Sequence, residues 1–407
     1  MGISLNKATP MIMHIDLNSC FATVEQQAHP HLRGKPIVIA AYPTDSGCIL
    51  APSIEAKKFG IKTGMRVREG KNLYPDLIVR TADTILIRDV HQKFKNICLD
   101  YSPDVIPRSI DEVVIDFSGT PALNRGLINI GREIKKRFRE EIGEWISCNV
   151  GISTNRFLAK TAASLHKPDG LDVIDYKNLE EILKKLTLID LYGINIRFEY
   201  RLNQAGIHSP LDFLKTPDHI LRKVVFKSIV GHYWYLRLRG FEVDDFKSTR
   251  KSFGQEYSLK EKTDDPNKLK KIIMKLCEKM GRRLRQSSQF TSGIHLGIFY
   301  QDYSFWHRGK KINMSISSTK NLFEEIMILF FLQPKIKVVS KISVSCFSLN
   351  QNNNQQLTLI DLGEEKINKI SGALDKINDR FGEFTITPAI MMDMKDTVVD
   401  RIAFGKS

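Results

Sequence analysis

Apolar and polar residues divide the first part of the chain into a regular series of elements. Short runs rich in β-branched residues predict strands near 11–16, 103–107, 112–117 and 146–152. Longer segments with apolar residues at helical spacing predict helices near 84–101 and 124–141. The order strand, helix, strand, strand, helix, strand is that of a split βαβ motif, whose first and third strands lie side by side. We therefore predict an α+β fold.

The same order of elements recurs in the last folded part, which we place at 252–349. Its strands and helices are predicted near 253–259, 266–286, 293–301, 308–316, 319–332 and 337–348. Between the two parts, short amphipathic helices are predicted from Leu179 to about Arg239, and a charged connector runs from Asp244 to Lys251. A stretch rich in Asn and Gln follows the second part, from Asn350 to Gln356.

Three carboxylates lie at the ends of predicted strands. Asp16 ends the first strand, and the adjacent Asp111 and Glu112 lie where the third strand leaves a turn. Neighbouring anions need a cation to offset their repulsion and desolvation, and Mg²⁺ fits because it takes one or two carboxylates and leaves positions for substrate phosphates. If the first and third strands are neighbours, the three acids share one site suited to two-metal nucleotidyl transfer. A solvated Asp-Glu turn is the alternative for the isolated pair.

The charge of the chain indicates a polyanionic partner. Lys and Arg total 61 and Asp and Glu total 46, which gives a net charge of +15. Nucleic acid is the natural candidate, since no long apolar stretch or membrane anchor is evident. We expect a chain located in the cytoplasm and associated with the nucleoid. The six cysteines are scattered without a Cys-x-x-Cys pair, which favours reduced, mostly buried thiols over a zinc site or disulfides.

Several ordered motifs resemble those of Y-family DNA polymerases. They are the segments 15–25, 55–65, 109–112, 151–160 and 167–170. The resemblance runs across nearly the whole chain and implies a right-hand polymerase with a ferredoxin-like palm, small fingers, a helical thumb and a C-terminal α/β little finger. The implied boundaries are palm 1–21 and 79–168, fingers 22–78, thumb 169–241, linker 242–251, little finger 252–349 and tail 350–407.

The resemblance also implies site residues. Asp16, Asp111 and Glu112 would be catalytic and would hold two Mg²⁺ ions with the backbone carbonyl of Leu17. Phe21 would exclude a ribose 2′-hydroxyl, although a buried core residue is its alternative reading. The implied nucleotide contacts are Ser19, Lys57, Lys160 and Lys167. Many members have Tyr and Arg where this chain has Ile54 and Lys57, so Lys57 retains the charge without the guanidinium fork.

Further residues are expected to bind DNA or a partner protein. The thumb resembles paired helix-hairpin-helix elements around Gly193 and Gly231, which could otherwise be plain helix connections. Asn195 replaces a second glycine of the first hairpin and is expected to tolerate left-handed backbone. In the little finger, phosphate contacts are expected from Lys251, Arg308 and Lys310, and the basic face of helix 266–286 is expected to be solvated. A segment similar to the bacterial sliding-clamp motif comprises Gln356, Leu357, Leu359 and Ile360, with Ile360 where Phe is usual.

The expected activity is template-directed, low-fidelity translesion DNA synthesis without proofreading. Primer-template DNA, deoxynucleoside triphosphates and the sliding clamp would be the partners of a monomer, and a need for accessory subunits stays open. A non-catalytic DNA-binding subunit of a repair complex and a palm-type nucleotide cyclase are the alternatives. The subgroup also stays open, because Asn18-Ser19 resembles DNA polymerase V whereas the segment 58–62 is equally typical of DNA polymerase IV.

Overall fold

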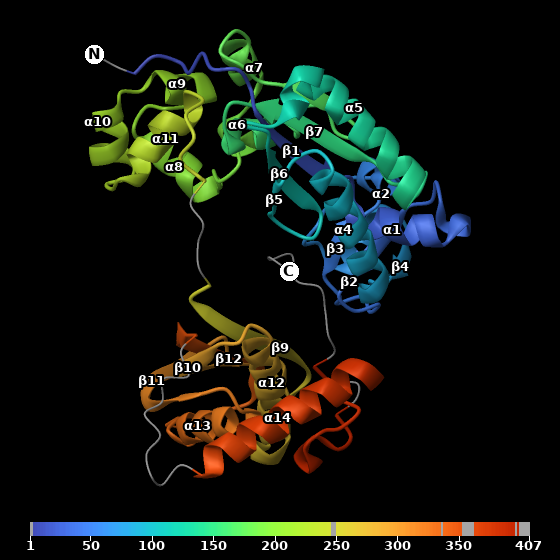
Figure 1. Cartoon of the computed structure of the whole chain (residues 1–407), viewed down its shortest axis with the longest axis vertical. Coiled ribbons are helices and arrows are strands. Elements are labelled where there is room, and N and C mark those ends of the chain that lie inside the picture. Colours follow the sequence, from blue (N-terminus) through green and yellow to red (C-terminus); the bar gives the residue numbers. More distant parts are fainter. Residues whose placement is uncertain (1–2, 246–249, 335–336, 352–361, 395–396, 399–407) are drawn as a thin grey trace. The chain divides into compact units, whose positions relative to one another are not determined.

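Figure 1 shows the computed structural model of the chain, which describes residues 3–245, 250–334, 337–351, 362–394 and 397–398. Two compact units adjoin in sequence between residues 246 and 247, inside the connector predicted from charge. A search of the described ranges for a helix long and apolar enough to cross a membrane finds none.

A five-stranded sheet forms the centre of the first unit, and β1 is its middle strand (Figure 1). The sheet order is β5-β6-β1-β7-β8. The strands span Ile12–Leu17 (β1), Asp104–Pro107 (β5), Glu112–Asp116 (β6), Cys148–Ser153 (β7) and Leu171–Val173 (β8). β1 pairs antiparallel with both β6 and β7, so the predicted pairing of the first and third strands is confirmed.

Different helices cover the two faces of this sheet. The main core holds Ile15 and Val113 together with residues of three helices, α1 (Cys20–Ala28), α4 (Thr84–Leu99) and α5 (Leu127–Arg137). Because side chains alternate along a strand, the even-numbered residues of β1 and β6 face the other way, toward Ala159 of α6 (Arg156–Ala162). Gly151 lets α6 lie close to β7, since a Cβ atom there would stand 2.0 Å from the carbonyl oxygen of Ala159.

The predicted helix near 84–101 is confirmed by α4, but the one predicted near 124–141 is divided. A 3₁₀ turn, η2 (Pro121–Arg125), precedes Gly126, whose φ of 78° interrupts the helix before α5 begins. After α5 the chain continues as one π turn, η3 (Phe138–Ile142). The apolar spacing continues through these breaks, which is why the pattern alone predicted one helix.

A smaller sheet with its own core lies between β1 and α4 in the sequence. Its order is β3-β2-β4, with β2 (Ile37–Ala40), β3 (Ile49–Pro52) and β4 (Ile78–Arg80), and the segment also contains η1 (Pro30–Leu32), α2 (Ile54–Lys58) and α3 (Val67–Leu73). Val38, Ile49, Ile61 and Val67 are fully buried in that core.

Short helices follow β8 and pack around stacked aromatic rings. They are α7 (Leu179–Lys185), η4 (Leu188–Asp190), α8 (Ile196–Gln204), α9 (Pro210–Lys215), α10 (Asp218–Ile220), η5 (Leu221–Val225) and α11 (Val230–Leu238). The rings of Phe213, Phe226 and Trp234 contact one another, and Phe157 of α6 packs edge-on against Trp234. This core therefore joins the short helices to α6.

The second unit has a four-stranded antiparallel sheet of order β11-β10-β12-β9 (Figure 1). Its elements are β9 (Ser252–Thr263), α12 (Pro266–Gln286), β10 (Phe290–Tyr300), β11 (Phe305–Ile316), α13 (Thr319–Phe331) and β12 (Val339–Asn350), and the tail adds α14 (Leu362–Phe381) and η6 (Ala389–Met391). The predicted order of strands and helices is confirmed, and β11 begins three residues earlier than expected because Phe305 pairs with Phe299.

The tail packs against α12, which corrects one prediction. Arg285 of α12 donates to both carboxylate oxygens of Asp375 in α14, at 2.6 and 2.8 Å. Lys275 is buried and donates to the backbone carbonyl of Met394, at 2.6 Å. The basic face of α12 was expected to be solvated, and this is wrong for Lys275 and Arg285 because tail residues cover them.

Candidate active site

Asp16 and Glu112 stand opposite each other on neighbouring strands. They form a Cα pair in the register of β1 and β6, and both belong to the face that α6 covers. Asp111 immediately precedes β6, and its backbone carbonyl accepts a 2.9 Å hydrogen bond from the amide of Leu17. The three predicted acids are thus brought together at one end of the central strand pair.

Burial raises the pKa of both Asp111 and Glu112. Loss of solvent is the largest cause for each carboxyl, and the charge of Asp16 adds to it. The hydroxyl of Ser109, which donates to Asp111, and the ammonium of Lys160 beside Glu112 act in the opposite direction. Burial therefore opposes the ionisation of both carboxyl groups, and Ser109 and Lys160 offset this effect only in part.

Lysines supply positive charge at this cluster. Lys160 of α6 donates to both carboxylate oxygens of Glu112, at 2.8 and 2.6 Å. Lys167 forms an ion pair with Asp16. The pKa of Lys57 is lowered, first by burial and then by the charge of Lys167, while Asp16 raises it. All three lysines predicted from the sequence therefore lie at or near the acids.

The sequence prediction missed His14 beside Glu112 and Tyr192 beside Lys160. His14 is buried, with Nε2 at 3.7 Å from a carboxylate oxygen of Glu112, and burial together with the charge of Lys160 lowers its pKa well below the usual value. Its position two residues before Asp16 places it on the same strand face, a signal that the sequence did contain. The ring of Tyr192 lies 4.1 Å from the ammonium of Lys160.

The donor set suits a hard divalent cation, because it consists of carboxylate oxygens. Within the described ranges, no group of three or more His, Cys, Asp or Glu side chains is arranged to hold a metal ion. Instead, the ammonium group of Lys160 forms an ion pair with Glu112, and that of Lys167 forms an ion pair with Asp16. The site fits a divalent cation provided that these lysines move away from the carboxylates.

The start of α1 adjoins the acidic cluster. Ser19 precedes the helix with a left-handed φ of 48°, an uncommon conformation for a residue other than glycine, and its buried Oγ has no hydrogen-bond partner among the described residues. Phe21 is fully buried in the main core. Because α1 begins at Cys20, the positive end of its dipole is only four residues after Asp16 in the sequence.

The two predicted thumb glycines lie near the starts of helices. Gly193 adopts a φ of 94° in the turn between η4 and α8. Gly231 lies inside α11, where a Cβ atom would stand 2.5 Å from the backbone of Leu221. The explanation expected for Asn195 is wrong, because its backbone is extended and its side chain caps α8 by accepting from the amides of Arg197 and Phe198.

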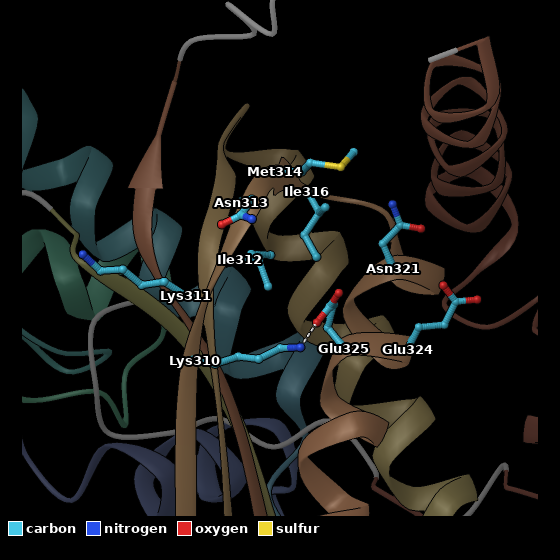
Figure 2. Close-up of a pocket in the computed structure, with 9 residues that line it drawn as sticks. All are labelled: Lys310, Lys311, Ile312, Asn313, Met314, Ile316, Asn321, Glu324 and Glu325. Atoms are coloured by element: carbon cyan, nitrogen blue, oxygen red, sulfur yellow. Dashed lines mark ion pairs between the residues drawn. The ribbon is translucent and has the colours of Figure 1, made fainter. Parts of the chain in front are cut away.

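Figure 2 shows Lys310, one of the predicted phosphate contacts of the second unit, on β11. Lys310 forms an ion pair with Glu325 of α13, beside a cavity of about 470 Å³ between the strand and this helix. Arg308 and Lys310 pair with buried residues of β10, so they lie on the helix-covered face of the sheet, whereas Lys311 lies on the other face. Lys251 is exposed just before β9. The DNA contacts of these residues stay predictions.

The predicted clamp-binding residues, Gln356, Leu357, Leu359 and Ile360, lie outside the described residues.

Comparisons with known proteins decide the family. Residues 15–164 match the impB/mucB/samB family, and residues 250–359 match the C-terminal domain of the same family. The DNA polymerase IV of Pelotomaculum thermopropionicum is 32% identical over 404 residues, which cover 96% of this chain and 97% of that protein. The chain belongs to the Y family of DNA polymerases and is of the DNA polymerase IV type.

Other Y-family polymerases agree with this. The DNA polymerase IV of Moorella thermoacetica is 30% identical over 94% of this chain and 96% of its own length. Among solved structures, a Y-family DNA polymerase chimera of Dbh and Dpo4 superposes with a TM-score of 0.71, 25% identity and coverage of 84% of this chain and 100% of the chimera. The expected fold class is confirmed, and the choice between the polymerase IV and V types is resolved in favour of polymerase IV.

Proposed function

We propose that this Y-family chain is a DNA-directed DNA polymerase that carries out translesion synthesis by metal-assisted nucleotidyl transfer. The main support is the convergence of Asp16, Asp111 and Glu112 at one end of the central strands, with Lys57, Lys160 and Lys167 around them. A polymerase needs both features, since the acids bind metal and the lysines can neutralise a triphosphate. A non-catalytic DNA-binding subunit would have no electrostatic need for buried acids whose pKa is raised.

Asp16, Asp111 and Glu112 would hold two Mg²⁺ ions, with the backbone carbonyl of Leu17 as a further ligand. Bound there, the ions supply activation of the primer 3′-hydroxyl and charge neutralisation on the triphosphate. Lys160 and Lys167 would then exchange their carboxylate partners for phosphate oxygens, because both ammonium groups are already at the site. The Ser19 hydroxyl and the start of α1 provide further anion contacts.

Partner recognition also belongs to this proposal. Primer-template DNA would meet the thumb hairpins at Gly193 and Gly231 and residues of the second unit, and the protein would act as a monomer in the cytoplasm near the nucleoid. The segment 356–360 would bind the sliding clamp and raise the effective concentration of polymerase at the primer. Deleting 356–360 should lower processivity only when the clamp is present, and an equal loss without clamp would contradict this assignment.

Primer extension with Asp111→Asn and Glu112→Gln tests the catalytic assignment. Each variant should lose at least about a thousandfold in nucleotide insertion on an undamaged and on an abasic template, while primer-template affinity stays within about twofold. Asp116→Asn is the matched control, because Asp116 ends β6 on the same face but away from the cluster. If both variants extended the primer as efficiently as the wild type, this cluster would be excluded as the catalytic site.

A further inference from the structure

Lys160 has two partners that belong to different parts of the first unit. Its ammonium donates to both carboxylate oxygens of Glu112, at 2.8 and 2.6 Å, and stands 4.1 Å from the ring centroid of Tyr192. Glu112 begins β6 of the central sheet, whereas Tyr192 lies between η4 and α8 among the short helices. A single cation therefore joins the turn at Tyr192 to a predicted metal ligand.

The turn that carries Tyr192 is held in place on both sides. The next residue, Gly193, has a φ of 94°, and an atom added at its Cβ position would stand 3.4 Å from the ring of Trp234. Asn195 then fixes the start of α8 through its side chain. The Tyr192 side chain is nevertheless 56% exposed, so packing alone does not explain the position of its ring. The contact with Lys160 gives the ring a defined partner.

The contact between Lys160 and Tyr192 bears on metal binding, because Lys160 and a metal ion compete for the oxygen atoms of Glu112. Lys160 occupies both oxygens of Glu112, and a divalent cation would need the same atoms. A lysine held over an aromatic face costs more to displace than one that is free to swing into solvent, because the face attracts the ammonium. The ring therefore favours the state in which the lysine, rather than a metal ion, neutralises Glu112.

We propose that Tyr192 is a positioning residue that sets the divalent-cation affinity of the active site by holding Lys160 on Glu112. This rests on the proposed function, since it assumes that Glu112 is a metal ligand. The turn at Gly193 is also a predicted DNA contact, so duplex DNA that engages the turn displaces the ring and frees Glu112. Metal affinity then rises when primer-template is bound.

Mn²⁺ titration followed by electron paramagnetic resonance, on the full chain without DNA, tests the proposal independently of polymerase activity. Tyr192→Leu should bind Mn²⁺ about two- to fivefold more tightly than the wild type, since that is the change expected from loss of an exposed cation–π contact. Tyr192→Phe keeps the aromatic face and should match the wild type. Lys160→Met should tighten binding by at least as much as Tyr192→Leu.

Two further arms separate this role from a purely structural one. In a Glu112→Gln background, Tyr192→Leu should no longer change Mn²⁺ affinity, because the contested carboxylate is gone. Adding primer-template should tighten Mn²⁺ binding more in the wild type than in Tyr192→Leu. Equal affinities of the wild type and Tyr192→Leu without DNA would overturn the proposal even if primer extension is normal, whereas a chain inactive in extension would contradict the proposed function alone.

Discussion

At the residue scale, Phe21 is a buried core residue that we also predict to exclude a ribose 2′-hydroxyl. It is fully buried in the main core and lies in the first turn of α1, five residues after Asp16. A close-packed ring leaves no room for an additional oxygen, so replacing it by a smaller side chain should admit ribonucleotides. We expect Phe21→Leu to raise ribonucleotide insertion, relative to deoxynucleotide insertion, at least about tenfold.

Single-nucleotide insertion kinetics with ribo- and deoxynucleotides measure this ratio. Leucine is preferred to alanine because Phe→Ala in a core costs about 3–5 kcal/mol. Phe138→Leu is the matched control, since Phe138 is equally buried in the same core, and it should lose stability without changing sugar selection. Unchanged selection in Phe21→Leu would leave Phe21 as a core residue only.

Asp111 should reduce the stability of the metal-free protein at neutral pH. Its pKa is raised, mainly by desolvation, so the folded state disfavours its charged form relative to the unfolded state. The cost is present above the raised pKa and disappears as the pH falls below the ordinary carboxyl value of about 4. Asp111→Asn should therefore raise the Tm in a chelating buffer at pH 8.

Thermal unfolding of Asp111→Asn and wild type across pH 4 to 8 follows this difference. The Tm gain should shrink steadily toward acidic pH as the wild-type carboxyl becomes protonated. Asp116→Asn, on the same strand, should show no such gain. A lower Tm for Asp111→Asn at pH 8 would mean that the carboxylate is stabilised by its neighbours rather than strained by burial.

At the scale of elements, α14 belongs to the second unit, and two of its carboxylates form ion pairs with arginines of α12. The side chains of Arg285 and Asp375 are only 11% and 13% exposed, so Asp375→Ala would leave a largely buried guanidinium with only the more distant carboxylate of Glu278, at 3.9 Å. We expect a loss of about 3–5 kcal/mol of unfolding free energy for this unit. Urea denaturation followed by fluorescence in a Trp145→Phe, Trp234→Phe background, where Trp306 on β11 is the remaining tryptophan, measures the loss.

Asp379→Asn provides the control for that prediction. Asp379 pairs with Arg282 from the same face of α14 but is 53% exposed, so its loss should cost no more than about 1 kcal/mol. If Asp375→Ala costs no more than Asp379→Asn, the tail contributes little to the stability of the unit.

Sequence periodicity predicted the elements better than it predicted their contacts. The strands around Ile15 and Val113 were located within one or two residues, because apolar β-branched runs identify buried strands directly. The division at Gly126 was missed, since one glycine interrupts a helix without changing its apolar spacing. The partner of Arg285 was missed as well, because an ion pair across 90 residues leaves no local signal.

The candidate site could likewise be predicted only in part. The acids could be predicted because two of them are adjacent and the motif places the third on the neighbouring strand. The nearby lysines were predicted from the family resemblance as nucleotide contacts, and their pairing with the acids was not predicted. The contact between Lys160 and Tyr192 could not be predicted, since it depends on how the turn before α8 approaches α6.

At the scale of the whole chain, thiol reactivity reports whether both units are folded. Of the six cysteines only Cys48 is exposed, and burial raises the pKa of the thiols of Cys20, Cys98, Cys148, Cys277 and Cys346. Because the thiolate is the reactive form, these five should resist alkylation at pH 8.

A native chain should therefore take up one equivalent of a thiol reagent, and a denatured chain should take up six, as counted by intact mass. Cys48→Ser should reduce the native count to zero. Rapid modification of a second cysteine in the native chain would show that one of the two units opens under these conditions.

The central position of β1 has a consequence for the order of events during synthesis. This strand leaves the ribosome well before both of its hydrogen-bonding neighbours, which lie about a hundred or more residues later, in β6 and β7. The small sheet of β2, β3 and β4 is complete in sequence by Arg80 and can assemble while β1 still lacks neighbours. The three clustered acids can therefore meet only once β6 has emerged, and β1 keeps one edge unpaired until β7 is complete at residue 153.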